Sequence, residues 1–383
     1  MRGLAWVPAA VGQGDHVAAA DRPVYQDWTA IAPLLGLIVL AVTWGRHLPL
    51  VPVVLVAIVL AGAVLAAVHH AEIVAHRVGE PFGSLVLAVA VTVIEVALIV
   101  TLMVSGGDKA SALARDTVFS AVIITCSGVI GVSLLVATMR THVVLFNAEG
   151  TRAALATLTA LSTLCLVLPT FTTTRAVPEF SASQLAFAAL VSAALYGLFV
   201  FAQTVRHRES FLPVTPSGTA IDEADEHAAP PSVRATVLSL VLLLLCLVGV
   251  VGLAKVESPS IESGVAAAGF PPSVVGVIIA LLVLLPETLA AVRAARRDRV
   301  QTSFNLALGS AMASIGLTIP AIAFASIWLS GPIVLGLAPT QIVLLVLTVV
   351  VAILTVVPGR ATLMQAGVHI VVFASFVFFA IKP

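Results

Sequence analysis

The sequence predicts an all-α polytopic membrane protein of about eleven spanning helices, one leading helix plus two inverted five-helix repeats. The chain of 383 residues is 60% hydrophobic and only 10% charged, with a mean hydropathy of +1.13, whereas soluble proteins are about 25% charged. Its apolar residues form long continuous runs, and each half of the chain carries one acidic residue deep inside such a run. The net charge is zero, so nothing indicates a nucleic-acid partner. The expected partner is the lipid bilayer.

The predicted elements begin after residues 1–29, a polar tail without the apolar core of a signal peptide. Apolar runs of about 17–25 residues are typical of spanning helices. The eleven runs are residues 30–46, 48–68, 80–104, 116–138, 153–171, 183–204, 234–254, 271–292, 303–328, 338–357 and 361–380. The runs are continuous rather than alternating, which favours helices over a β-barrel. Helices also satisfy their own backbone hydrogen bonds in lipid.

The distribution of basic residues predicts the orientation. Eleven crossings place the two termini on opposite sides, and of the 19 lysines and arginines the N-terminal side receives 13 and the other side six. Cytoplasmic loops carry the excess of Lys and Arg, so the N terminus is predicted to be cytoplasmic. An Arg-rich chain without a targeting segment fits the inner membrane of a bacterial cell.

A long polar segment, residues 205–233, divides the chain into a first repeat at 48–204 and a second at 234–383, with the leading helix 30–46 outside both. Each repeat has five spans, an odd number, so the second must enter the membrane inverted. The segment carries an acidic cluster of Asp222, Glu223, Asp225 and Glu226. The cluster is predicted to be either a cytoplasmic regulatory loop that recruits cations or a plain linker. Deleting residues 220–228 distinguishes the two, because a linker leaves cation affinity unchanged.

Glu95 and Glu287 are the two deep acidic residues, one in each repeat, within the regions 79–138 and 271–328. An ionisable side chain at membrane depth is costly and is by default a functional hypothesis. Two in corresponding places indicate a shared cation or proton site. Pro286 removes a backbone hydrogen bond and predicts a kink beside Glu287.

The helix after each deep acid is rich in small and hydroxyl residues. Small residues permit close helix packing in lipid, and oxygen atoms can ligate a cation, so both interpretations stay open. The candidate ligands besides the two glutamates are Thr92, Ser127, Asn305, Gly309 and Ser310.

Four further residues are candidates for an access path: Glu80, Asp116, Glu72 and His76. Helix capping explains the first two equally well, and a solvated face at the membrane boundary explains the other two. The three cysteines have no metal-ligand spacing. No cofactor is expected.

Two long segments of the chain read HHAEIVAHRVGEPFGSLVLAVAVTVIEVALI and LLPETLAAVRAARRDRVQTSFNLALGSAMASIGLTIP. Together they resemble a known family, the ChaA-type cation/proton antiporters of the calcium/cation antiporter superfamily. The resemblance implies two repeats whose acids, by position Glu95 and Glu287, meet at the membrane centre. It also implies that protons drive export of a cation.

The chain departs from the calcium/proton branch of that superfamily, in which a Gly-Asn pair precedes each glutamate. The matching positions are Val91 and Thr92, and Val283 and Leu284. The Leu-Gly-Ser element of the second repeat is present at residues 308–310, but the Gln that follows it is replaced by Ala313. The resemblance therefore leaves Na⁺, K⁺ and Ca²⁺ open as the exported cation.

The working hypothesis is antiport by competition between a cation and protons for the two carboxylates. Desolvation favours the neutral carboxyl group and a bound cation favours the charged one. A cation channel and a membrane enzyme are the alternatives. The enzyme is disfavoured because the deep acids are glutamates and no span shows a convincing Ser–His pair.

Overall fold

The computed structural model describes residues 28–46, 48–79, 82–106, 111–175, 178–214, 231–328 and 331–383. The predicted N-terminal tail, Glu80 and the acidic cluster of the 205–233 segment lie outside these residues.

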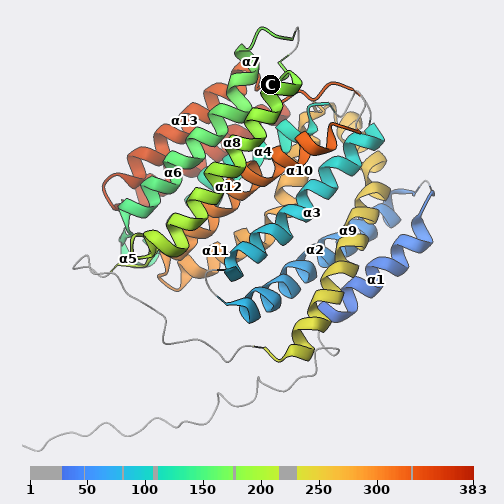
Figure 1. The fold of residues 1–383 in the computed structure, drawn as a ribbon, viewed down its shortest axis with the longest axis horizontal. Coiled ribbons are helices and arrows are strands. Elements are labelled where there is room, and N and C mark those ends of the chain that lie inside the picture. The colour runs from blue at the N-terminus through green and yellow to red at the C-terminus, as the bar shows by residue number, and fades with distance from the viewer. Residues whose placement is uncertain are drawn as a thin grey trace, which may run out of the picture.

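The described residues are almost entirely helical (Figure 1). The helices of the first half are α1 (Trp28–Thr43), α2 (Leu50–Val78), α3 (Phe82–Gly106), α4 (Leu113–Ile123), η3 (Ile124–Val129), α5 (Ile130–Thr141), α6 (Ala148–Ser162), η4 (Thr163–Val167), α7 (Leu168–Phe171), α8 (Ala182–Phe201), η5 (Ala202–Arg206) and η6 (Arg208–Phe211). Those of the second half are α9 (Val233–Ala267), α10 (Ser273–Val283), α11 (Leu285–Arg296), α12 (Val300–Ala325), α13 (Pro339–Val356) and α14 (Leu363–Ile381).

Apolar helical segments stand at all eleven predicted positions. Among the described residues, eight helical segments are long and apolar enough to cross a membrane, and the bent pair α10 and α11 forms a ninth. Two shorter apolar helices, Trp28–Thr43 and Val89–Val104, occupy the remaining two positions. The predicted class, an all-α polytopic membrane protein, is confirmed.

The helices α2 and α9 run about ten residues beyond their predicted ends at 68 and 254. The prediction stopped where polar residues begin, yet His70 and Glu257 are 0% and 2% exposed inside the longer helices. Their side chains are covered because α1, α2 and α9 pack against one another, and His70 Nε2 lies 3.0 Å from the carbonyl oxygen of Thr29 in α1. Tertiary packing therefore extends these helices past the apolar run.

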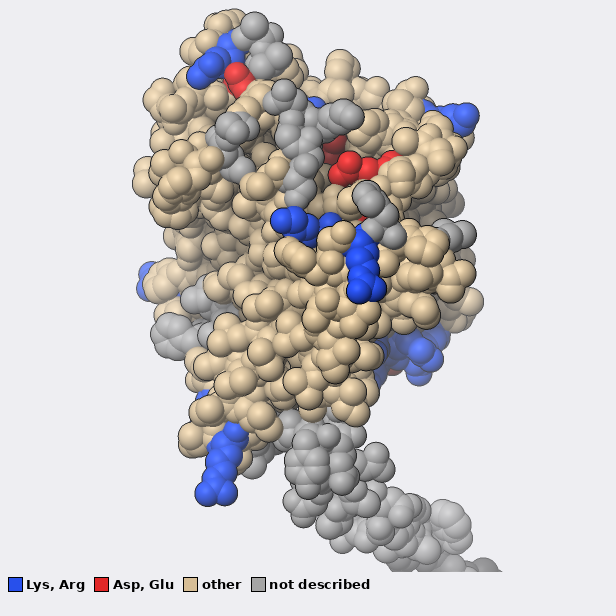
Figure 2. All heavy atoms as spheres, turned by 90° about the vertical axis from the view of Figure 1, so that its right-hand side faces the viewer, with Lys and Arg blue, Asp and Glu red and all other residues tan. Residues whose placement is uncertain are grey.

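The outer surface of this three-helix group suits lipid. In α1, Trp28, Ile31 and Ile38 are all more than half exposed. Figure 2 shows a face made mostly of uncharged residues, with Lys and Arg side chains beside Asp and Glu in its upper half. Apolar side chains that the protein leaves exposed are stable here because the acyl chains of a bilayer, rather than water, surround them.

The two halves of the chain exchange their packing partners. The third span of the second half, α12, packs against α3, α6 and α8 of the first half. The third span of the first half, α4–η3–α5, packs against α10, α11, α13 and α14 of the second half. This reciprocal pattern is the one expected of two repeats related by a pseudo-two-fold axis.

A glycine lies at a close contact between each third span and a helix of the other half. A Cβ atom on Gly131 of α5 would lie 3.0 Å from the Cβ of His369 in α14, and one on Gly316 of α12 would lie 2.5 Å from the Cβ of Tyr196 in α8. Each third span thus approaches the last helix of the other half closely at a glycine.

Short extended segments close both ends of the bundle. β1 (Val143–Leu145) pairs antiparallel with β2 (Arg360–Thr362), with Val144 opposite Ala361. At the other end an isolated antiparallel bridge joins Glu179 to Val334. Each contact links a loop of one half to a loop of the other.

Candidate cation and proton site

Glu95 projects from the middle of α3 into the interior and is 4% exposed. Ser314 of α12 donates a hydrogen bond from Oγ to Glu95 Oε1 at 2.5 Å. Hydroxyl donors lie about 2.5–2.7 Å from an ionised carboxylate. Because α3 and α12 belong to different halves of the chain, this bond ties the two halves together at the first deep acid.

Glu287 lies at the break between α10 and α11, where the helix axis bends by 53°. The kink predicted at Pro286 is confirmed, and Glu287 occupies the first turn of α11. The positive end of the helix dipole favours a negative charge at that position. The Oε2 atom of Glu287 is buried and has no hydrogen-bond partner. A buried oxygen without a donor is suited to accept a cation or carry a proton.

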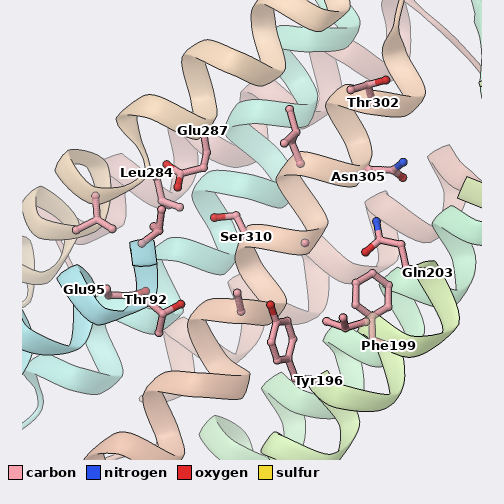
Figure 3. A pocket seen from close by; sticks show the side chains of 16 residues that line it. Thr92, Glu95, Tyr196, Phe199, Gln203, Leu284, Glu287, Thr302, Asn305 and Ser310 are labelled. Atoms are coloured by element: carbon pink, nitrogen blue, oxygen red, sulfur yellow. The ribbon is translucent and has the colours of Figure 1, made fainter. Parts of the chain in front are cut away.

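A cavity of about 220 Å³ lies between the two acids and the opposite helices (Figure 3). In this view Glu95 and Glu287 lie on one side of α12, and Tyr196, Phe199 and Gln203 lie on the other. The cavity is lined by Val91, Thr92, Glu95, Tyr196, Phe199, Val200, Gln203, Val283, Leu284, Glu287, Thr302, Asn305, Leu306, Gly309, Ser310 and Ala313. Its volume accommodates a small ion with several water molecules.

Two acidic side chains line the cavity and no basic side chain balances them among the described residues. Glu95 and Glu287 are close enough to interact through their charges, and Glu287 also interacts with Glu72 of α2. The cavity lining includes no Lys, Arg or His among the described residues. Two like charges in a cavity of low polarity need a cation or protons to balance them.

Most of the predicted ligands meet in this cavity. Thr92, Asn305, Gly309 and Ser310 all line it together with the two glutamates. Ser127 does not, because it is fully buried in η3 with its Oγ 3.5 Å from Thr348 Oγ1 of α13.

Asn305 is held by a chain of polar contacts at the edge of the cavity. Its Nδ2 donates to the carbonyl oxygen of Phe211 at 2.7 Å, and its Oδ1 accepts from Gln301 Nε2 at 2.9 Å. Gln301 in turn accepts a hydrogen bond from the backbone N–H of Asn147 at 2.7 Å. These bonds fix the orientation of the amide and connect α12 to η6 and to the start of α6.

The three access-path candidates among the described residues, Glu72, His76 and Asp116, do not line the cavity. Glu72 and His76 are exposed near the end of α2, and Glu72 interacts through its charge with His69 and Arg293. Asp116 is 6% exposed at the start of α4, where it lines a different cavity.

Sequence reasoning missed several residues that the fold brings to the site. Tyr196, Phe199 and Gln203 come from α8 and η5, which carry no deep acid and gave no signal. Ser314 belongs to the hydroxyl-rich helix after Glu287, but only the packing of α12 on α3 reveals its contact with Glu95.

The positions at which the chain departs from the calcium/proton branch all line the cavity. Val91, Val283, Leu284 and Ala313 present apolar side chains beside the two carboxylates. Besides the two acids, six neutral side chains that line the cavity carry an oxygen atom, namely Thr92, Tyr196, Gln203, Thr302, Asn305 and Ser310, and the other lining residues are apolar or glycine.

Comparison with known families identifies the chain. The family model described as sodium/calcium exchanger protein matches residues 48–205 and 238–382. This chain belongs to the sodium/calcium exchanger protein family. The two matched ranges correspond closely to the two predicted repeats and leave out the segment between them. As a member of this family of exchangers, the chain is an integral membrane antiporter of cations and is not an enzyme.

Two curated relatives match nearly the whole chain. The chain is 45% identical over 375 residues to y4hA of Sinorhizobium fredii (strain NBRC 101917 / NGR234), covering 96% of this chain and 99% of that protein. It is 32% identical over 364 residues to the sodium-potassium/proton antiporter ChaA of Escherichia coli (strain K12), covering 93% and 97%.

Solved exchanger structures share the fold. Native YfkE matches with a TM-score of 0.67 at 17% identity and covers 94% of this chain and 100% of its own. The H⁺/Ca²⁺ exchanger CAX matches with a TM-score of 0.67 at 16% identity and covers 92% of this chain and 87% of its own. At these identities the likeness concerns the fold alone.

Proposed function

We propose that this exchanger moves a cytoplasmic cation, Na⁺, K⁺ or Ca²⁺, outward in exchange for protons, and that Glu95 and Glu287 bind cation and protons alternately. One observation carries the proposal. Glu95, which is buried, and Glu287, which is partly buried, come from opposite halves of the chain and face the same cavity, and no basic side chain among the described residues lines it.

The cation approaches from the end of the bundle where Gln203 and Asn305 line the cavity. Arg206, at the end of η5, and Arg299, at the start of α12, lie at the same end. Cytoplasmic loops concentrate such residues, which supports a cavity that communicates with the cytoplasm. We place the protein in a bacterial inner membrane with its N terminus cytoplasmic on the same argument.

Binding begins when both carboxylates are charged. Ser314 stabilises the charged form of Glu95 through its hydrogen bond, and the N-terminus of α11 does the same for Glu287. The hydroxyl groups of Thr92 and Ser310 and water supply further oxygen ligands. On the other side of the membrane, protons displace the cation and neutralise both acids.

Exchange is obligatory if only the cation-loaded and protonated forms change their access. Two bare carboxylates facing each other in a cavity closed to water are costly, so an empty, charged site does not cross. That cost is what separates an antiporter from a channel.

The identity of the cation depends on the oxygen ligands. Ca²⁺ takes six to eight oxygen ligands, and the side chains of Val91, Val283, Leu284 and Ala313 offer none. This lining, together with the name of the ChaA relative, supports Na⁺ and K⁺ ahead of Ca²⁺. A comparison of the three cations under one proton gradient tests this order.

The test of the proposed function is proton movement in proteoliposomes that contain a pH-sensitive dye. Na⁺, K⁺ and Ca²⁺ are added separately to the wild type and to the Glu95→Gln and Glu287→Gln variants. The matched control is Glu149→Gln, because Glu149 is an exposed acid at the start of α6. We expect cation-dependent proton flux in the wild type and the control, and none in the two site variants. Full flux in both site variants would refute the scheme.

Conduction is measured on the same samples. Cation currents at equal clamped pH on both sides would favour a channel, because a channel needs no proton exchange.

A further inference from the structure

A cavity of about 640 Å³ lies between the turn that follows α1 and the last third of α9. It is lined by Trp44, Gly45, Arg46, Leu48, Lys255, Val256, Pro259, Ser260 and Ser263. None of these residues lines the carboxylate cavity. Small-ligand sites have volumes of about 300–1,000 Å³, so the cavity is large enough to hold a ligand of its own.

Two basic side chains line this cavity, Arg46 and Lys255, and no acidic side chain does among the described residues. The next acid along α9 on a similar face, Glu262, lines the neighbouring cavity beside α4, and its Oε1 accepts a hydrogen bond from Ser258 Oγ at 2.9 Å. Charges of one sign that gather at a concave surface attract ions of the opposite sign. The cavity is therefore suited to an anion.

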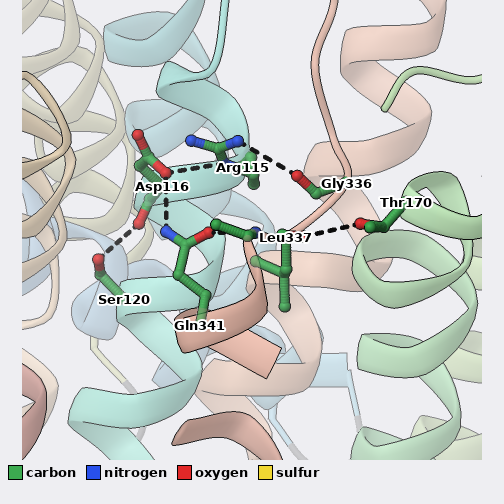
Figure 4. A network of polar contacts seen from close by, with 8 residues as sticks. Arg115, Asp116, Ser120, Thr170, Gly336, Leu337 and Gln341 are labelled. Carbon is green, nitrogen blue, oxygen red and sulfur yellow. Dashed lines mark hydrogen bonds and ion pairs between the residues drawn. The ribbon is translucent and has the colours of Figure 1, made fainter. Parts of the chain in front are cut away.

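Basic residues are scarce on this side of the membrane and are otherwise paired. The sequence predicts only six of the 19 lysines and arginines here: Arg46, Lys109, Arg115, Arg175, Lys255 and Lys382. Arg115 Nε donates to Asp116 Oδ1 at 2.8 Å (Figure 4), and Arg175 Nε lies 3.9 Å from Glu179 Oε1. The two basic residues of the cavity form no ion pair with any residue that the structure describes. Their charges are thus left for a ligand.

The groups around the cavity suit a phosphate in particular. The planar guanidinium of Arg46 can bind two phosphate oxygens at once, and the ammonium group of Lys255 adds a point charge. Ser260 and Ser263 contribute hydroxyl groups from the same helix as Lys255. Leu48 lines the cavity just before α2 begins, and α2 is 29 residues long. The free N–H groups and the dipole at such a helix N-terminus also favour an anion.

Trp44 places the cavity at the surface of the bilayer. Its side chain is 54% exposed, and Lys255 Nζ lies 5.3 Å from the centroid of its ring. Tryptophan is enriched at the level of the lipid headgroups. Beside the cavity, Val42 of α1 and Val51 of α2 are 56% and 70% exposed, as suits contact with acyl chains. A phosphate held in the cavity is therefore at headgroup depth, next to a surface that its acyl chains can cover.

We propose that this cavity binds the phosphate headgroup of an anionic phospholipid, and that Arg46 and Lys255 hold the phosphate. The site goes beyond the proposed function, because it depends neither on the transported cation nor on proton exchange. It gives the turn between α1 and α2 and the end of α9 a shared ligand at the membrane surface.

The test is quenching of Trp44 fluorescence by brominated lipids, with the full chain in vesicles. Trp6, Trp28 and Trp328, the other three tryptophans, are replaced by phenylalanine. The vesicles mix phosphatidylglycerol, which is anionic, with phosphatidylcholine, which is not, and the bromine is carried by one lipid or by the other in separate samples. The ratio of the two quenching values gives the relative affinity of the two headgroups beside Trp44, and it cancels any change in the emission of Trp44 itself.

We expect a preference of about tenfold for phosphatidylglycerol at Trp44, because each basic side chain near a membrane surface adds to the attraction for anionic lipid. The preference disappears when Arg46→Gln and Lys255→Gln are combined, and it persists when Arg46→Lys and Lys255→Arg are combined. Lys382→Gln is the matched control. It removes one basic residue predicted on the same side that does not line the cavity, and it leaves the preference unchanged.

A second reporter separates a site from general attraction to the protein. A protein that retains Trp328 as its single tryptophan places the reporter just beyond α12, away from the cavity, where its side chain is 69% exposed. We expect no headgroup preference there. An equal preference at Trp328 and Trp44 would overturn the proposal.

Three further results at Trp44 would also overturn it. The first is equal quenching by the two lipids in the wild type, and the second is a preference that survives in the glutamine double variant. The third is a Trp44 that neither lipid quenches, which indicates that another part of the protein or a second copy covers the cavity. Millimolar inorganic phosphate, added at constant ionic strength, distinguishes the lipid from a free ion. Loss of the preference on its addition would assign the cavity to free phosphate, whereas an unchanged preference supports the lipid.

Discussion

Replacing Ser314 with alanine tests the link between the hydrogen bond to Glu95 and the competition of cation with proton. Ser314 Oγ donates to Glu95 Oε1 at 2.5 Å, and both side chains are buried. A hydrogen bond to a charged group contributes about 1.5–3 kcal/mol, and about 1.4 kcal/mol corresponds to a tenfold change in an equilibrium constant. The hydroxyl also forms a hydrogen bond with the protonated acid, although a weaker one, and this offsets part of the stabilisation. The net preference for the charged form is therefore at the lower end of that range, about tenfold in the equilibrium between the charged and protonated forms.

The direction follows from which form the bond stabilises. The hydroxyl favours the charged carboxylate, the form that binds the cation, so its loss favours the protonated form. At fixed pH the apparent KM for the cation therefore rises by about tenfold, and the activity profile moves to higher pH. The maximal rate at saturating cation and high pH stays close to that of the wild type.

The assay is cation-dependent proton flux in proteoliposomes, measured over a series of cation concentrations at several pH values. Ser192→Ala is the matched control, because Ser192 is equally buried and its Oγ donates to Ala189 of its own helix. A Ser314→Ala protein with an unmoved pH profile and an unchanged KM would show that this bond does not affect the competition.

Two further predictions concern the cavity wall and the packing of the halves. Leu284→Asn adds an amide oxygen beside Glu287, and we expect it to lower the apparent KM for Ca²⁺ several-fold in the same flux assay. Leu284→Ala, which adds space but no oxygen, is the control and should leave this KM unchanged. An equal effect of both variants would contradict the reasoning. Gly316→Leu forces a side chain against Tyr196 and should destabilise the protein by about 1–3 kcal/mol, seen as a lower Tm in detergent. Gly197→Leu, where a Cβ atom meets nothing within 4 Å, is its control, and equal Tm values for the two would count against close packing at Gly316.

The sequence alone determined the class of the protein, an all-α polytopic membrane protein, and it predicted the two deep acids. Apolar runs of membrane length have only one low-energy solution in lipid, the helix. A charged side chain within such a run stands out because it is costly. Glu95 and Glu287 were identified for that reason, and the break at Pro286 followed from a missing backbone donor.

The tertiary structure decided which polar residues serve the site. Ser127 and Ser314 both lie in hydroxyl-rich helices and look alike in the sequence, yet Ser127 meets α13 while Ser314 meets Glu95. The residues of α8 at the cavity carry no local signal because they act only where α8 packs against α12. The close contact of Gly276 with Asp116 and Thr117 likewise joins helices distant in the sequence, so only the tertiary structure reveals why a glycine stands there.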